Sequence, residues 1–359
     1  MKPFKNYIAT WFYRESHEEA SYYPQAGGRG DSALLHSVYM QIQVPFFTTF
    51  RHYNPEAELL FFTNLEADQL PPFLTELFQR TRTEVVTLPY RNRPPKGWYK
   101  AWMNQFYVYD IFKEMERRMQ PGDTLLVCDA DCLCRTPLHS LFQSIRTDGS
   151  TLYDLGCPQG FSINGTTLAQ MEEFYTSCYG ERPSSPMAYY GGEFIGLRAD
   201  AVHGVNREFP VVWQFNFNLP ADTARLHEEA HIFSVLAERL HLRYATANRY
   251  VKRLGTTPIY NNVSPGDEKL SVWHLPSEKK FGLYRLYRIL ERDKGILDEQ
   301  RFWAKAGTYC GIPHIGWGKK ACDFILTLKE KLKYHPTHWY ASKDAQRKDS
   351  KRPDVGHHQ

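Results

Sequence analysis

Short apolar runs alternate with longer amphipathic segments through the first half of the chain, and no other feature limits the fold as strongly. The apolar runs predict strands and are residues 7–12, 58–62, 84–88 and 124–128. The segments between them predict helices from about residue 32 across Pro45, from the proline pair at 71 and 72 to about residue 80, and over residues 99–118. This order predicts an α/β fold with a mostly parallel mixed sheet flanked by helices. Such a sheet binds ligands beyond the carboxyl ends of its strands.

The second half of the chain is less regular. It contains an apolar run at residues 187–197 and a short strand at 270–275. The predicted helices are residues 222–240, 283–291, 298–305 and 322–333. The predicted domains are a main domain over 1–295, a C-terminal helical extension over 296–340 and a basic tail over 341–359. The polar composition of that tail predicts disorder.

Charge is distributed unevenly along the chain. The net charge is +4, but residues 319–359 hold ten Lys or Arg against five Asp or Glu. The rest of the chain is therefore nearly neutral, which argues against nucleic acid as the main ligand. The basic C-terminal region predicts a peripheral contact with an anionic membrane surface.

The cysteines and the hydropathy indicate the compartment. The chain has seven cysteines, and Cys128, Cys132 and Cys134 lie beside a predicted buried strand. Their spacing with His139 does not suit zinc, so we expect reduced, buried thiols. No window approaches the ~18 apolar residues of a membrane span, and the first residues lack the apolar region of a signal peptide. We therefore expect a cytoplasmic protein, with peripheral contact at the inner face of the membrane.

Two carboxylates follow the most apolar predicted strand. Asp129 and Asp131 come directly after residues 124–128. At the end of a strand this spacing lets both side chains converge on one hard cation, which would in turn neutralise a diphosphate. The alternative is a surface turn or a helix cap, where Asp is common.

A second motif, His227-Glu228-Glu229-Ala230-His231, matches the H-E-x-x-H pattern of zinc peptidases. On a helix the two histidines would share one face, as zinc binding requires. The sequence offers no Glu between residues 239 and 267 as a third ligand. A zinc metallopeptidase that uses His227, Glu228 and His231 remains an alternative.

His274 ends a predicted strand and is followed by Lys279 and Lys280. The imidazole could complete a metal site, and the two ammonium groups could hold phosphate oxygens. Lys100, on the predicted helix before the strand of residues 124–128, is a further candidate phosphate ligand. A structural histidine and solvated lysines are the alternative interpretation.

In this order, the segments resemble nucleotide-sugar glycosyltransferases of the GT-A (Rossmann-like) fold. They are most similar to the retaining blood-group A and B and α-galactosyl transferases. The resemblance spans about residues 5–290 and rests on the D-x-D at 129–131, on YYGGEFIG at 189–196, on HEEAH at 227–231 and on residues 270–280. His274 departs from that family and is similar to the C-terminal metal ligand of glycogenin-like transferases. The membrane anchor of the animal enzymes is also missing.

The resemblance implies roles for individual residues. Asp129, Asp131 and His274 would bind Mn²⁺ or Mg²⁺, and Glu229 would be the nucleophile. Glu193 stands where the family has a small residue and would act beside Glu229 at the reacting sugar. The implied donor-binding residues are Thr10, Phe12, Tyr13, Lys100, Asp129, Gly191, Gly192, Lys279 and Lys280.

The expected activity is metal-dependent transfer of a hexose or N-acetylhexosamine from a UDP-sugar to a glycan or glycolipid acceptor. The resemblance implies retention of anomeric configuration and a place in polysaccharide or lipopolysaccharide biosynthesis. A non-catalytic nucleotide- or glycan-binding protein is a second alternative. A nucleotidyltransferase is a third, although the sequence lacks a Gly- and Lys-rich loop directly after its first strand.

Overall fold

The computed structural model describes residues 4–24, 27–99, 101–220, 223, 225–242, 246–257 and 260–333. The chain divides into two compact units, Met1–His314 and Ile315–Gln359. The described part of the second unit contains helix α10 (Trp317–Lys333), which begins before residue 322, where its start was predicted. Lys100 and the predicted tail over 341–359 lie outside the described residues. The division of the chain into functional domains stays a prediction.

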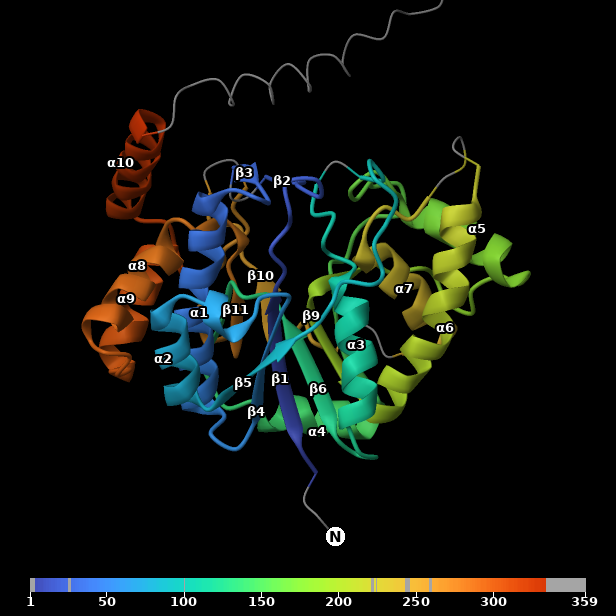
Figure 1. The fold of residues 1–359 in the computed structure, drawn as a ribbon, viewed down its shortest axis with the longest axis horizontal. Helices are drawn as coiled ribbons and strands as arrows, with labels where there is room; N and C mark the ends of the chain where they lie inside the picture. The colour runs from blue at the N-terminus through green and yellow to red at the C-terminus, as the bar shows by residue number, and fades with distance from the viewer. Residues whose placement is uncertain are drawn as a thin grey trace, which may run out of the picture. The chain divides into compact units, whose positions relative to one another are not determined.

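A six-stranded mixed sheet forms the centre of the first unit (Figure 1), in the order β5-β4-β1-β6-β9-β8. Its strands are β1 (Asn6–Phe12), β4 (Glu58–Thr63), β5 (Thr83–Thr87), β6 (Thr124–Cys128), β8 (Ser150–Asp154) and β9 (Tyr190–Arg198). The first four in that order are parallel, and β9 runs antiparallel to both β6 and β8. The predicted α/β fold with a mostly parallel mixed sheet is confirmed.

Helices cover both faces of this sheet (Figure 1) because successive side chains of each strand point to opposite sides. On β1, Ile8 belongs to one hydrophobic cluster, and Tyr7 and Ala9 belong to the other. The first cluster includes residues of α1 (Ala33–Tyr53), α2 (Pro72–Thr81), α4 (His139–Asp148), α8 (Gly282–Arg292) and α9 (Glu299–Cys310). The second includes residues of α3 (Tyr107–Arg118), α5 (Leu168–Tyr179), α6 (Ala199–Asn218) and α7 (Glu229–Arg239).

A small second sheet brings distant parts of the chain to the carboxyl end of β6. It has the order β10-β11-β7, from β7 (Cys132–Cys134), β10 (Val251–Arg253) and β11 (Val272–His274). In its register His274 pairs with Cys132 on one side and with Arg253 on the other. A third sheet is the hairpin of β2 (Tyr22–Tyr23) and β3 (Gly28–Arg29). The three-stranded sheet therefore fixes His274 beside the loop that follows β6.

Two predicted helices begin later than their sequence patterns indicated. The helix predicted from residue 99 begins at Tyr107, because Trp102 has a left-handed φ of 48° and turns the chain. The helix predicted from residue 222 begins at Glu229. Before it, the Asn216 side chain accepts a hydrogen bond from Leu226 N and donates one to Leu226 O, both 2.9 Å long. The backbone N–H and C=O groups of Leu226 therefore have partners without being part of a helix.

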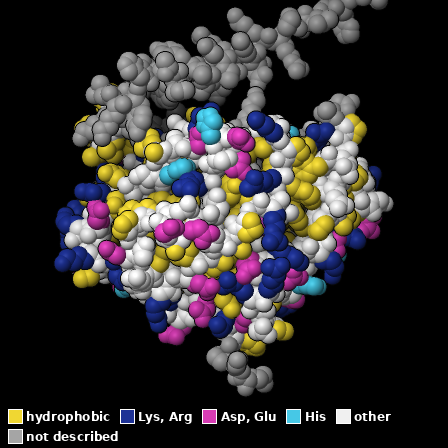
Figure 2. Space-filling model, viewed as in Figure 1, with side chains coloured by type: hydrophobic (Ala, Val, Ile, Leu, Met, Phe, Trp, Pro, Cys, Tyr) yellow, Lys and Arg dark blue, Asp and Glu magenta, His cyan; other side chains and the backbone are white. Residues whose placement is uncertain are grey.

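On the face shown in Figure 2, acidic and basic side chains are interspersed, as on an ordinary solvated surface. None of the helices in the described part of the chain combines the length and the apolar character needed to cross a bilayer.

Candidate functional site

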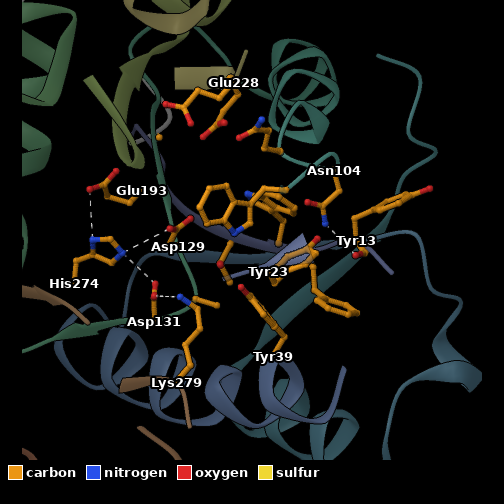
Figure 3. A pocket seen from close by; sticks show the side chains of 18 of the residues that line it. Tyr13, Tyr23, Tyr39, Asn104, Asp129, Asp131, Glu193, Glu228, His274 and Lys279 are labelled. Atoms are coloured by element: carbon orange, nitrogen blue, oxygen red, sulfur yellow. Dashed lines mark hydrogen bonds and ion pairs between the residues drawn. The ribbon is translucent and has the colours of Figure 1, made fainter. Parts of the chain in front are cut away.

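A cavity of about 370 Å³ opens beside the carboxyl ends of β1 and β6 (Figure 3). Its walls come from at least seven separate segments of the first unit. The lining residues are Thr10, Trp11, Phe12, Tyr13, Tyr23, Tyr39, Trp102, Asn104, Gln105, Asp129, Ala130, Asp131, Asn164, Tyr189, Gly192, Glu193, Glu228, Glu229, Arg253, His274 and Lys279. This is the edge of the sheet at which ligands of open α/β folds bind.

Asp129, Asp131 and His274 converge at one side of the cavity. One ligand atom from each lies within 4.8 Å of the other two. Nε2 of His274 is 3.3 Å from Oδ1 of Asp131 and 3.6 Å from Oδ2 of Asp129. Pairing of β11 with β7 produces this approach, and Leu275 N also donates to Asp131 O at 3.0 Å. The structure thus brings together the three residues that the sequence suggested as metal ligands.

The electrostatics of this cluster fit a cation. Burial alone would raise the pKa of Asp131, but the charges of Lys279 and His274 hold it well below its usual range. Burial likewise opposes the charged form of His274, yet the neighbouring Asp131 and Asp129 raise its pKa well above the ordinary value. Asp131 Oδ1 and both ring nitrogens of His274 have no partner with hydrogen-bond geometry among the described residues. Two carboxylates and an imidazole are a donor set that suits Mn²⁺.

Lys279 is buried and contacts this cluster through Asp131. Its ammonium group contacts Oδ2 of Asp131 and lies 5.7 Å from the ring centre of Tyr39. Burial would lower the pKa of Lys279, but the Asp131 carboxylate raises it above its ordinary value. The lysine is therefore charged at the cavity wall, whereas Lys280 is not among the lining residues.

Glu193 approaches His274 from the opposite side. Its carboxylate accepts from Arg253 Nε at 2.7 Å and from Arg253 Nη2 at 2.8 Å. Oε1 of Glu193 is also 3.5 Å from Nδ1 of His274. Burial would raise the pKa of Glu193, but Arg253 and then His274 hold it well below the ordinary value.

Glu228 and Glu229 form a second pair of acidic side chains in the cavity. Glu228 accepts hydrogen bonds from the Tyr189 hydroxyl and the Asn164 amide. Oε2 of Glu229 is buried with no hydrogen-bond partner in the described chain, and burial followed by the charge of Glu228 raises its pKa well above the usual value. Both line the same cavity, because Glu228 is the extended residue before α7, with φ −133° and ψ 166°.

Two glycines of β9 make room for the acidic side chains. A Cβ atom at Gly192 would lie 2.3 Å from Oε1 of Glu229, and one at Gly191 would lie 2.1 Å from Oε2 of Glu193. Gly192 lines the cavity, whereas Gly191 is not among its lining residues. The paired glycines therefore set where both carboxylates can lie.

An aromatic wall closes the side of the cavity next to β1. Thr10, Phe12 and Tyr13 all line the cavity, and the sequence analysis had suggested them as residues that bind the nucleotide. Tyr39 also lines the cavity but was missed, as were the lining polar groups Asn104, Gln105, Asn164 and Arg253.

The zinc-peptidase alternative is not favoured. His227 precedes α7, and its ring stacks on Tyr99 with 5.6 Å between ring centres. His231 is buried, with Nε2 3.0 Å from the carbonyl oxygen of Ile163. Among the described residues, the group with metal-ligand geometry is Asp129, Asp131 and His274, which leaves the H-E-x-x-H histidines out.

The thiols near the cavity are structural. Cys128, Cys132 and Cys134 are free and buried, as the sequence predicted. Burial raises the pKa of the Cys128 thiol and, more strongly, that of Cys132. A raised pKa disfavours the thiolate that metal binding or nucleophilic attack requires.

No family model matches the chain, and no curated protein matches its sequence. Several solved structures are similar in fold. The galactosyltransferase LgtC, in complex with donor and acceptor sugar analogs, has 12% identity and a TM-score of 0.45, over 88% of this chain and 99% of that one. The bifunctional glycosyltransferase WbbM has 11% identity and a TM-score of 0.48, over 85% and 52%. Mouse xyloside xylosyltransferase 1 has 10% identity and a TM-score of 0.44, over 75% and 97%.

Proposed function

We propose that this chain is a metal-dependent glycosyltransferase of the GT-A fold. It would move a hexose or N-acetylhexosamine from a UDP-sugar to a glycan or glycolipid acceptor, with retention of configuration. The observation that carries the proposal is the convergence of Asp129, Asp131 and His274 within 4.8 Å at the wall of the cavity beyond β6. The sequence resemblance at residues 189–196 and 227–231 supports the same assignment for the opposite wall.

The donor would lie across the cavity from the aromatic wall to the acidic pair. Thr10, Phe12 and Tyr13 would contact the base and ribose, and Lys279 would donate to a diphosphate oxygen. A divalent cation held by Asp129, Asp131 and His274 would neutralise charge that develops on the departing diphosphate. The sugar would lie beside Gly192 and Glu229, which both line the cavity. Roles for Lys100 and Lys280 stay predictions from the sequence.

Glu229 would act on the anomeric carbon. Its carboxylate would attack that carbon as the bond to the diphosphate oxygen breaks, and the electron pair would leave with the nucleoside diphosphate. An acceptor hydroxyl would then displace Glu229 from the same carbon and pass its proton to a diphosphate oxygen. Two displacements retain the anomeric configuration. Burial suits this role, because a carboxylate of raised pKa is the stronger nucleophile once it is ionised.

The decisive experiment is donor hydrolysis by the purified full chain. UDP- and GDP-sugars would be screened with and without Mn²⁺, and the anomer of the first-formed sugar would be read by NMR. We expect Mn²⁺-dependent release of UDP from one UDP-sugar, an α-anomeric product, and no release by Asp131→Ala. UDP binding without turnover of any sugar would support a non-catalytic binding protein instead, and zinc-dependent peptide cleavage would restore the peptidase alternative.

The basic C-terminal region would hold the chain at an anionic membrane, where lipid-linked acceptors are found. This part of the proposal rests on the net positive charge of residues 319–359, which include ten basic and five acidic residues. Co-sedimentation with vesicles of anionic lipid would compare the full chain with a chain truncated after Gly318. Equal binding of the two would refute this part of the proposal.

A further inference from the structure

The imidazole of His274 lies between carboxylates at both of its nitrogens (Figure 3). Nε2 faces Asp131 at 3.3 Å, whereas Nδ1 faces Glu193 at 3.5 Å. All three side chains are buried, with 3% exposure for His274, 2% for Glu193 and none for Asp131. The ring is thus buried at the cavity wall, and Nδ1 faces a different carboxylate from those that Nε2 faces.

Glu193 is itself held in place by a second contact. The guanidinium of Arg253 donates to both of its oxygens, at 2.7 and 2.8 Å, in the fork geometry that fixes a carboxylate plane. The backbone of Arg253 is anchored in turn, since its N–H donates to the Tyr153 hydroxyl at 3.0 Å. Arg253 also pairs with His274 in the register of β10 and β11. Glu193 is therefore fixed relative to the ring that it faces.

We infer that Glu193 is the positioning residue of the candidate metal centre and not a group that touches the donor sugar. This inference rests on the proposed function, because it assumes that His274 ligates the cation. A ligating imidazole must present a nitrogen without a proton, and a carboxylate at the other nitrogen keeps the proton there and orients the ring. With Glu193 at Nδ1, the lone pair of Nε2 would be left free to bind a cation that Asp129 and Asp131 also hold.

This role differs from the one that the resemblance implied for Glu193, which was at the reacting sugar. The carboxylate meets Arg253 and His274 rather than Glu229, and the glycine at 191 leaves room for this conformer. Glu193 would accordingly govern how tightly the metal is bound. Loss of such a partner lowers metal affinity by about 10- to 100-fold in other metal sites.

The test is titration of the full chain with Mn²⁺ alone, with free Mn²⁺ measured by its EPR signal. Glu193→Gln keeps the size of the side chain but removes its charge. We expect this variant to bind Mn²⁺ at least about tenfold more weakly than the unmodified chain. The matched control is Glu15→Gln, because Glu15 is a similarly buried carboxylate that contacts Ser21 and Tyr23 instead of His274. The control should bind Mn²⁺ with unchanged affinity.

A spectroscopic readout separates positioning from general damage to the fold. Pulsed EPR of bound Mn²⁺ detects nitrogen from a coordinated imidazole. This signal should be strong in the unmodified chain, absent in His274→Ala and weakened in Glu193→Gln at metal saturation. If Glu193→Gln fails to fold because Arg253 is left unpaired, Glu193→Gln/Arg253→Met removes both charges and should show the same loss of Mn²⁺ affinity.

Two outcomes would overturn the inference in distinguishable ways. If Asp131→Ala abolishes Mn²⁺ binding while Glu193→Gln binds Mn²⁺ with full affinity and full nitrogen signal, Glu193 has no positioning role and the metal centre stands. If the unmodified chain does not bind Mn²⁺ at all, the metal centre of the proposed function fails and the inference fails with it.

Discussion

A Cβ atom at Gly192 would lie 2.3 Å from the Oε1 atom of Glu229, so the absence of a side chain on β9 sets the position of a carboxylate on α7. The contact involves the mobile end of Glu229 and not its backbone. A methyl group at this position would therefore move the carboxylate without disrupting the sheet. Gly192→Ala thus isolates the placement of Glu229 from the stability of the fold.

We predict that Gly192→Ala lowers the rate of donor hydrolysis at least about tenfold, because misplacement of a reacting group by about 1 Å can cost 100-fold. The melting temperature should stay close to that of the unmodified chain. Gly160→Ala is the control, since a Cβ atom there meets nothing within 4 Å. Unchanged turnover in Gly192→Ala would argue against Glu229 as the reacting carboxylate.

Asp131 and Lys279 form a buried ion pair that Asp131→Ala would break. The remaining ammonium would be buried without its carboxylate, which costs about 3–5 kcal/mol of unfolding free energy in comparable cases. The double variant Asp131→Ala/Lys279→Met removes both charges and should recover most of this loss. Denaturant unfolding of the metal-free proteins measures both values. Equal stability of the single and double variants would show that the pair contributes little.

Asp129 should behave differently, because its side chain is 44% exposed and that of Asp131 is fully buried. Asp129→Ala should unfold at nearly the same temperature as the unmodified chain without metal. Mn²⁺ stabilises a protein that binds it only when folded, by about 2.7 kcal/mol at 100 times the dissociation constant. We expect Mn²⁺ to raise the melting temperature of the unmodified chain but not that of Asp129→Ala. A full Mn²⁺ shift in the variant would exclude Asp129 as a ligand.

The raised pKa of Glu229 should make the free energy of unfolding depend on pH. Burial and the charges of Glu228, Asp129 and Glu193 raise its pKa well above the ordinary value of 4.5, so the folded chain holds this proton more tightly than the unfolded chain does. As pH rises above 4.5, the unfolded state loses the proton first and this carboxyl increasingly destabilises the fold. Glu229→Gln should therefore gain in melting temperature over the unmodified chain, by more at pH 8 than at pH 5.

Melting curves in metal-free buffer between pH 5 and pH 8 test this expectation. Glu76→Gln is a suitable control, because Glu76 is an exposed residue of α2 that does not line the cavity, and the substitution should give a difference that is constant with pH. A difference for Glu229→Gln that is equally constant with pH would contradict a raised pKa for Glu229.

The sequence predicted those parts of the fold that are encoded by local pattern. The strands β1, β4, β5 and β6 read as short apolar runs, and Asp129 and Asp131 follow directly from the end of β6. His274 was recognisable because it ends a strand and precedes Lys279. In each case neighbouring residues alone carry the signal.

The features that sequence reasoning missed depend on residues far apart in the chain. The start of α7 is set by hydrogen bonds between Asn216 and Leu226, and the Glu193–Arg253 pair joins positions 60 residues apart. Trp102 adopts a left-handed backbone that periodicity cannot reveal. Helix α6 was missed entirely, because its Gly204 and Pro210 interrupt the helical pattern in a segment that the structure nonetheless continues from Ala199 to Asn218.

The pairing of β7 with β11 has a consequence for the order in which the site can form. All six strands of the central sheet are contained in the first 198 residues, and both aspartates emerge with them. The histidine comes from a strand that ends at residue 274, so a chain released from the ribosome only to the end of β9 would carry two carboxylates and no imidazole. The cluster of Asp129, Asp131 and His274 can therefore be completed only after the chain has been synthesised beyond residue 274, and a product that ends at β9 would lack it.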